Sequence, residues 1–91
     1  LEEQALANGS MLVYPNPTPS SVHVKVNLEE GRAMGELRDA NGATVKTYFD
    51  QNFSSGVHTI FWDMDGLASG MYFLVIRNNE KTLLEKVVKM K

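Results

Sequence analysis

Residues 22–28 read Val-His-Val-Lys-Val-Asn-Leu, and this stretch decides the fold class. Its four apolar residues occupy every second position, and polar residues stand between them. Successive side chains of a β-strand point to opposite faces, so this alternation predicts a strand with one buried and one solvent-facing side. A helix would instead place its apolar residues at a period of about 3.6 residues.

The same two-residue period recurs along the chain and predicts an all-β protein. Strands are expected over residues 11–14, 22–28, 33–39, 44–49, 57–63, 70–77 and 82–89. Between the third and fourth, Asp39-Ala40-Asn41-Gly42 predicts a bulged hairpin turn with its glycine at positive φ. We therefore expect an immunoglobulin-like antiparallel β-sandwich of about seven strands.

Several single residues are predicted to fill the core of this sandwich. Leu37, Val45 and Leu67 are the candidates outside the strongest strands, and Trp62 is expected at a central position. The chain has no cysteine, so it lacks the cysteine pair that brackets the tryptophan in antibody domains.

Length and charge restrict the classes of protein that fit. The 91 residues suffice for one domain, and the formal net charge of −2 does not suit a nucleic-acid partner. Residues 1–10 are polar and end in turn formers, so they are expected to be a linker from an upstream part of the protein or a cloning remnant, and residues 11–91 are expected to be the folded domain. The absence of cysteine also excludes thiolate metal sites.

Candidates for chemistry are few, and we expect neither an enzyme nor a cofactor, metal or small-molecule substrate. His23 and His58 do not stand at a metal-ligand spacing. The stretch from Asp63 to Asp65 resembles the start of a calcium-binding loop. Such a loop needs glutamate at its twelfth position, which here is Leu74. Side-chain bonds to the local backbone explain these aspartates better.

The stretch 70–77 is apolar on both faces, so both faces need cover. One interpretation places a loop or the N-terminal segment over the second face. The other is an exposed patch that binds a partner or a second copy of the chain. The residues expected in that patch are Phe61, Met71, Phe73 and Val75.

Charge is distributed unevenly along the chain. Residues 77–91 carry five basic and two acidic residues, a net charge of +3, whereas residues 1–76 carry a net charge of −5. Lysines on an edge strand prevent edge-to-edge pairing of sheets. Physical reasoning alone favours this interpretation of the basic stretch. The alternative is a basic terminal strand offered to a receptor by strand addition.

The order of several motifs resembles the C-terminal sorting domain of the type IX (Por) secretion system of Bacteroidetes. Tyr14-Pro15-Asn16-Pro17 opens the module, and its prolines are expected to end the first strand or confine it to an edge. The later motifs, in order, are Asp39-x-x-Gly42, Gly56-Val57-His58, Leu67-x-x-Gly70-Met71-Tyr72 and Lys86-Val87-Val88-Lys89-Met90-Lys91. The resemblance spans residues 11–91, and the opening motif is interpreted as the start of the module, without a recognition role.

The resemblance implies an export label carried by a larger cargo in cis. The label would pass through the periplasm, be recognised by an outer-membrane translocon or shuttle protein, and end at the cell surface or outside. A sortase-like peptidase would cut within or near residues 1–12, and the cargo would be attached to anionic lipopolysaccharide. The implied recognition residues are Gly70, Met71, Tyr72, Lys86, Val87, Val88, Lys89, Met90 and Lys91.

Two other functions remain open at this point. Residues 56–63 also resemble an immunoglobulin-like repeat of flagellar hook-capping domains, although Met64 stands where that repeat has glycine. Aromatic residues near Phe61 and Phe73 would suit an immunoglobulin-like carbohydrate-binding or adhesive spacer module of a surface protein.

Overall fold

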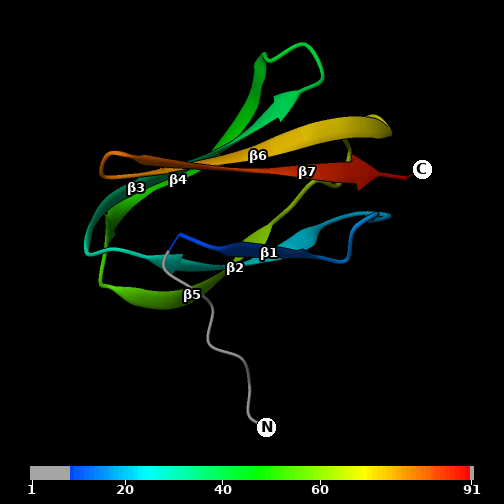
Figure 1. The fold of residues 1–91 in the computed structure, drawn as a ribbon. Helices are drawn as coiled ribbons and strands as arrows, with labels where there is room; N and C mark the ends of the chain where they lie inside the picture. The colour runs from blue at the N-terminus through cyan, green and yellow to red at the C-terminus, as the bar shows by residue number, and fades with distance from the viewer. Residues whose placement is uncertain (1–8, 91) are drawn as a thin grey trace, which may run out of the picture.

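The structure is a computed structural model that describes residues 9–90. These residues form two antiparallel sheets that pack face to face, as Figure 1 shows. The strands are β1 Met11–Tyr14, β2 Val22–Leu28, β3 Gly31–Asp39, β4 Thr44–Phe53, β5 Gly56–Trp62, β6 Gly70–Asn78 and β7 Lys81–Lys89. Within residues 9–90, no helix is long and apolar enough to cross a membrane.

The predicted β-sandwich is confirmed, and its strand order is informative. One sheet has the order β1-β2-β5 and the other β4-β3-β6-β7. In constant-type immunoglobulin domains the fourth strand belongs to the sheet of the first, second and fifth. Here β4 pairs instead with β3, so it lies at the edge of the sheet that contains β6 and β7.

The core lies between the sheets and follows the alternation in the sequence. Val22, Val24, Val26 and Leu28 are buried from one side, and Trp62 beside them is completely buried, as predicted. Leu37, Leu74, Ile76 and Val87 are buried from the other sheet. Burying such side chains contributes roughly 1.5–3 kcal/mol each, and this is what holds the two sheets together.

The prediction that Val45 is a core residue was wrong, because its side chain is 38% exposed. The tip of the β3–β4 hairpin extends away from the body of the sandwich in Figure 1, so Val45 has no opposing sheet to pack against. Tyr48 and Phe49 pack against the core in its place.

The strand β4 is also longer than expected. Residues 50–53 were expected to be loop, but they continue the pairing with β3. Asp50 forms an ion pair with Arg32 at 2.7 Å on the outer face, and Phe53 packs edge-on against Phe49 on the inner face. These two contacts explain why a polar stretch remains a strand.

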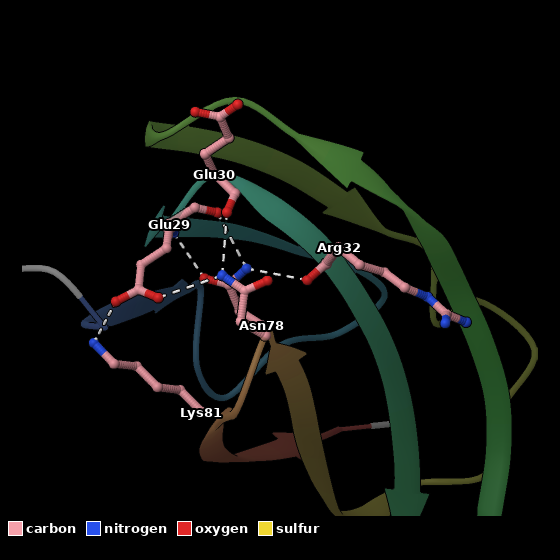
Figure 2. A network of polar contacts seen from close by, with 6 residues as sticks. Glu29, Glu30, Arg32, Asn78 and Lys81 are labelled. Atoms are coloured by element: carbon pink, nitrogen blue, oxygen red, sulfur yellow. Dashed lines mark hydrogen bonds and ion pairs between the residues drawn. The ribbon is translucent and has the colours of Figure 1, made fainter.

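One end of the sandwich is closed by a polar network around Asn78, which Figure 2 shows. The Asn78 amide is buried and donates to the carbonyl oxygens of Glu29 and Arg32 at 3.2 and 3.1 Å. Its Oδ1 accepts the Glu29 backbone N–H at 2.7 Å. Lys81 adds an ion pair to Glu29 at 2.7 Å. The network fixes the turn between β6 and β7 to the connection between the two sheets.

Candidate recognition surface

The two stretches expected to carry recognition lie next to each other in the structure. The beginning of β6 pairs with the end of β7 in antiparallel register, with Gly70 opposite Lys89, Met71 opposite Val88 and Tyr72 opposite Val87. These segments are therefore neighbours in one sheet, although about fifteen residues separate them in the chain. Lys91, the last residue of the expected set, lies outside the described residues.

Only some of these side chains face solvent, because neighbours along a strand point to opposite faces. Tyr72 and Val87 are buried in the core, and the Tyr72 hydroxyl donates to the Ala68 carbonyl at 2.7 Å. Lys89 is only 7% exposed. Met71, Lys86, Val88 and Met90 have exposed or half-buried side chains, so these are the ones that a partner could touch.

The opening motif is placed against the same strand. The Asn16 side chain donates to the Lys86 carbonyl at 2.8 Å and accepts the Val88 N–H at 3.0 Å. The Thr18 N–H donates to the Val88 carbonyl at 2.9 Å, and the Thr18 carbonyl accepts the Met90 N–H at 2.7 Å. These four hydrogen bonds, which we call the edge clip, occupy the outer edge of β7 over residues 86–90 as a neighbouring strand would.

The edge clip has its own local support. Thr18 is fully buried, and its hydroxyl donates to the Ser21 carbonyl at 2.6 Å while accepting the Ser20 N–H at 3.1 Å. As expected, β1 is an edge strand that ends at Tyr14, immediately before Pro15. The bonds from Asn16 to β7 were not foreseen. The available signal was an asparagine between two prolines, whose backbones have no N–H to donate.

The expected apolar patch of Phe61, Met71, Phe73 and Val75 is not one surface. Phe61 is 58% exposed but lies on β5, on the outer face of the three-stranded sheet. Met71 and Phe73 lie on β6, on the outer face of the other sheet. Val75 shares that face but is only 4% exposed, because Glu36 and Leu84 stand directly opposite it on the neighbouring strands.

Phe61 belongs to a short aromatic row across the three-stranded sheet. Tyr14, His23 and Phe61 stand opposite one another in the register. The ring centroids of Tyr14 and His23 are 5.6 Å apart and stacked, and those of His23 and Phe61 are 5.4 Å apart and tilted. The stacked rings cover each other's faces, so the row does not form a flat aromatic platform.

Asp63 makes the local backbone contacts that its turn predicts. Its Oδ1 accepts the Asp65 N–H at 2.9 Å and the Ser21 hydroxyl at 3.2 Å, and these bonds lower the pKa of Asp63. Burial raises the pKa of Tyr48 to about 12, with a smaller effect from the charge of Asp63. Across residues 9–90, no three acidic, histidine or cysteine side chains form a group that could hold a metal ion.

The expected cleavage region divides into two parts. Residues 1–8 lie outside the described residues. Gly9 and Ser10 are already bonded to Asn27 of β2, at 3.1 and 3.2 Å, and Met11 and Leu12 belong to β1. A peptidase needs an extended and unpaired substrate, so the pairing of residues 9–12 makes them poor sites for cleavage.

A family model described as a secretion system C-terminal sorting domain matches residues 12–90. The match covers β2 to β7, β1 except for Met11, and both parts of the edge clip. A search of curated proteins found no match.

Proposed function

The chain belongs to the family of type IX secretion C-terminal sorting domains, and we propose that the paired ends of β6 and β7 are what the secretion machinery reads. Membership implies interaction with that machinery and secretion to the cell surface or outside, and this family is not an enzyme family. The observation that carries the proposal is the register that places Gly70 opposite Lys89 and Met71 opposite Val88.

In this proposal the domain acts as a folded label on an upstream cargo in cis. The cargo reaches the periplasm first, and an outer-membrane translocon or shuttle protein then binds the label. The buried core supports recognition of the folded label, because the β6–β7 pair exists as a surface only when the sandwich is folded. A short linear signal would not need Tyr72 and Val87 in a core.

We further propose that a sortase-like peptidase removes the label upstream of Gly9 and that the cargo then remains attached at the surface. The support is the backbone pairing of Gly9 and Ser10 with Asn27, which ties the following bonds into the sheet. Intact mass measurement of an exported reporter fused to residues 1–91 tests this step. A new C-terminus within residues 1–8 is expected, and a C-terminus inside β1 would contradict it.

The test of the main proposal is where such a reporter is found. A periplasmic reporter carrying residues 1–91 at its C-terminus should reach the outside of a type IX-competent host. In an isogenic host without the outer-membrane translocon it should remain in the periplasm. A reporter retained in the periplasm of both hosts would contradict the proposal.

Carbohydrate binding or adhesion is a less favoured second candidate. It has exposed Phe61 in its favour, but the neighbouring rings stack on one another and offer no flat surface to a sugar. Saturable glycan binding that is lost in Phe61→Ala, without loss of folding, would support it. The match to the sorting family argues likewise against a hook-capping role.

A further inference from the structure

The outer face of the β6–β7 hairpin carries several apolar side chains, and those of Met71 and Leu84 are exposed. Met71 stands opposite Val88, and Val75 stands opposite Leu84. Leu84 is 62% exposed and Met71 is 42% exposed. We use the name hairpin face for the side chains of Met71, Phe73, Leu84, Val88, Arg77 and Lys86.

This exposure has no explanation within the described part of the chain. The inner face of β6 packs on the three-stranded sheet, whereas the exposures of Met71 and Leu84 show that the hairpin face is open to solvent. Contiguous apolar side chains on the surface of a small domain usually mark a site of interaction. The hairpin face is therefore a candidate site for a partner.

The charges at this face indicate what kind of occupant fits. On the β3 and β4 side, Arg38 bonds to Glu36 at 3.0 Å, and Arg32 pairs with Asp50 at 2.7 Å, so these charges are compensated locally.

Arg77 stands at one end of the hairpin face, and Lys86 stands opposite Phe73 near its middle. Within residues 9–90 neither side chain forms an ion pair. They leave a local excess of two positive charges on a chain whose formal net charge is −2. A shallow hollow of about 240 Å³, lined by Arg32, Met34, Arg77 and Asn79, lies at the Arg77 end. The complement of this surface is an apolar patch accompanied by carboxylates.

The edge clip decides how the end of β7 can be approached. Strand addition would need the outward N–H and C=O groups of residues 86–90. Asn16 and Thr18 already use those of Lys86, Val88 and Met90. In the folded domain a partner can therefore reach this part of β7 through its side chains but not through its backbone.

We propose that the hairpin face docks a protein of the secretion machinery whose contact surface combines apolar side chains with carboxylates. This inference rests on the proposed function and names the surface that acts in it. A second copy of the chain fits less well, because Arg77 and Lys86 of two copies would be brought onto one interface and like charges oppose each other.

Competition for export tests the inference. A reporter fused to residues 1–91 is expressed together with free residues 1–91, sent to the periplasm by an ordinary signal. The free wild-type chain should reduce reporter export. Leu84→Asp and Arg77→Glu should each require roughly tenfold more free chain for the same reduction, because interface residues of this kind often contribute more than 1 kcal/mol.

Matched controls separate binding from folding. Val57→Asp places the same charge on an exposed residue of the opposite sheet, and Lys46→Glu reverses a charge on β4. Both should compete as the wild type does. Thermal unfolding of each free chain checks that it is folded, and Leu84→Ser replaces Leu84→Asp if the latter unfolds.

Four results would overturn the inference. The first is full competition by folded Leu84→Ser and Arg77→Glu while the wild-type reporter is still exported, which leaves the proposed function intact. The second is stronger competition by Asn16→Ala, which would indicate strand addition at the freed edge. The third is binding to vesicles containing phosphatidylglycerol that these variants abolish, since this would assign the face to lipid. The fourth is a dimer in light scattering that Leu84→Ser dissolves. Failure of the wild-type reporter to leave the periplasm would instead contradict the proposed function itself.

Discussion

Gly35 lies where two aromatic rings pack directly onto the backbone of β3. A Cβ at this position would stand 2.9 Å from Cζ2 of Trp62 and still closer to the ring of Phe49. The two rings meet edge to face with centroids 5.9 Å apart and cover the centre of the core. At this point the absence of a side chain is a packing requirement.

We predict that Gly35→Ala destabilises the domain by about 1–3 kcal/mol, because the added methyl group must displace one of the two rings. Urea unfolding followed by tryptophan fluorescence measures this directly. Thr47→Ala, on the exposed part of β4, is the control and should leave the midpoint nearly unchanged. An unchanged midpoint in Gly35→Ala would contradict the packing described for Trp62.

Asp63 gives the domain an acid-sensitive turn. Its hydrogen bonds from the Asp65 N–H and the Ser21 hydroxyl favour the ionised carboxylate and lower its pKa below the usual value of 3.8. A group with a lowered folded pKa stabilises the fold above its unfolded pKa, and this contribution is lost as the pH falls through the folded pKa.

We therefore predict that Asp63→Asn lowers the thermal midpoint at pH 7 and that its difference from the wild type shrinks as the pH falls below about 3.8. Thermal melts of both chains between pH 2.5 and pH 7 provide the measurement, with the pH changed in steps of about half a pH unit near the carboxylate pKa. A difference that stays constant over this range would show that the charge of Asp63 does not act on stability.

For single residues, the local sequence pattern predicted burial well wherever burial depends only on which face of the strand a side chain occupies. Alternation placed Val22, Val24 and Val26 in the core, and the aspartate-to-glycine turn placed Gly42 at a φ of 88°. It failed for Val45, because burial there depends on whether the other sheet reaches the hairpin tip. Such contacts between distant segments leave no periodic signal in the sequence.

Among the elements, the connection between β1 and β2 does more than link two strands. Its Asn16 and Thr18 bond to the outer edge of β7, seventy and more residues further along the chain. In Figure 1 the loop after β1 and the end of β7 lie at the same end of the sandwich. The edge clip therefore joins the two ends of the module and protects an exposed strand edge.

We predict that Asn16→Ala loosens the end of β7 without unfolding the sandwich. Loss of a hydrogen bond contributes about 1 kcal/mol, so exchange of the Val88 amide should accelerate roughly fivefold. Amides of β2 should keep their protection, because no clip bond reaches them. Amide hydrogen exchange followed by NMR is the measurement.

The control for that experiment is Asn52→Ala, an exposed asparagine on β4 at the far edge of the same sheet. It should leave the Val88 amide unaffected. If exchange at Val88 were equal in Asn16→Ala and the wild type, the side-chain bonds of Asn16 would not hold β7.

The types and the order of the elements were predictable from the sequence, whereas the end of β4 and the contacts at the edge of β7 were not. Turn residues and alternation located all seven strands, but β4 extends four residues further than its polar sequence suggested. Its extension depends on the ion pair of Asp50 with Arg32 across to β3 and on the contact of Phe53 with Phe49 within β4. The role of Asn16 was missed for the same reason, since its partners lie at the other end of the chain.

On the scale of the whole molecule, the two sheets have different outer faces. The three-stranded sheet exposes the aromatic row of Tyr14, His23 and Phe61, and the four-stranded sheet exposes the hairpin face. The motifs of the sequence indicated the family and the segments involved, but not which side chains remain accessible. Burial of Tyr72, Val87 and Lys89 restricts a partner to the outward half of the expected residues.

This burial also changes how charge reversal should be tested. Lys89→Glu would place a carboxylate at a position that is only 7% exposed, so loss of export could reflect loss of folding. Lys86 is exposed and stands opposite Phe73 on the hairpin face, so Lys86→Glu alters the surface while leaving the core intact.

The central claim is that the folded domain itself directs export. Its most direct test is the fraction of a periplasmic reporter found outside a type IX-competent host, compared between a fusion to residues 1–91 and the same reporter ending at residue 8. We predict that the first is exported and that the second stays in the periplasm. Equal export of the two reporters, or retention of both, would contradict the account.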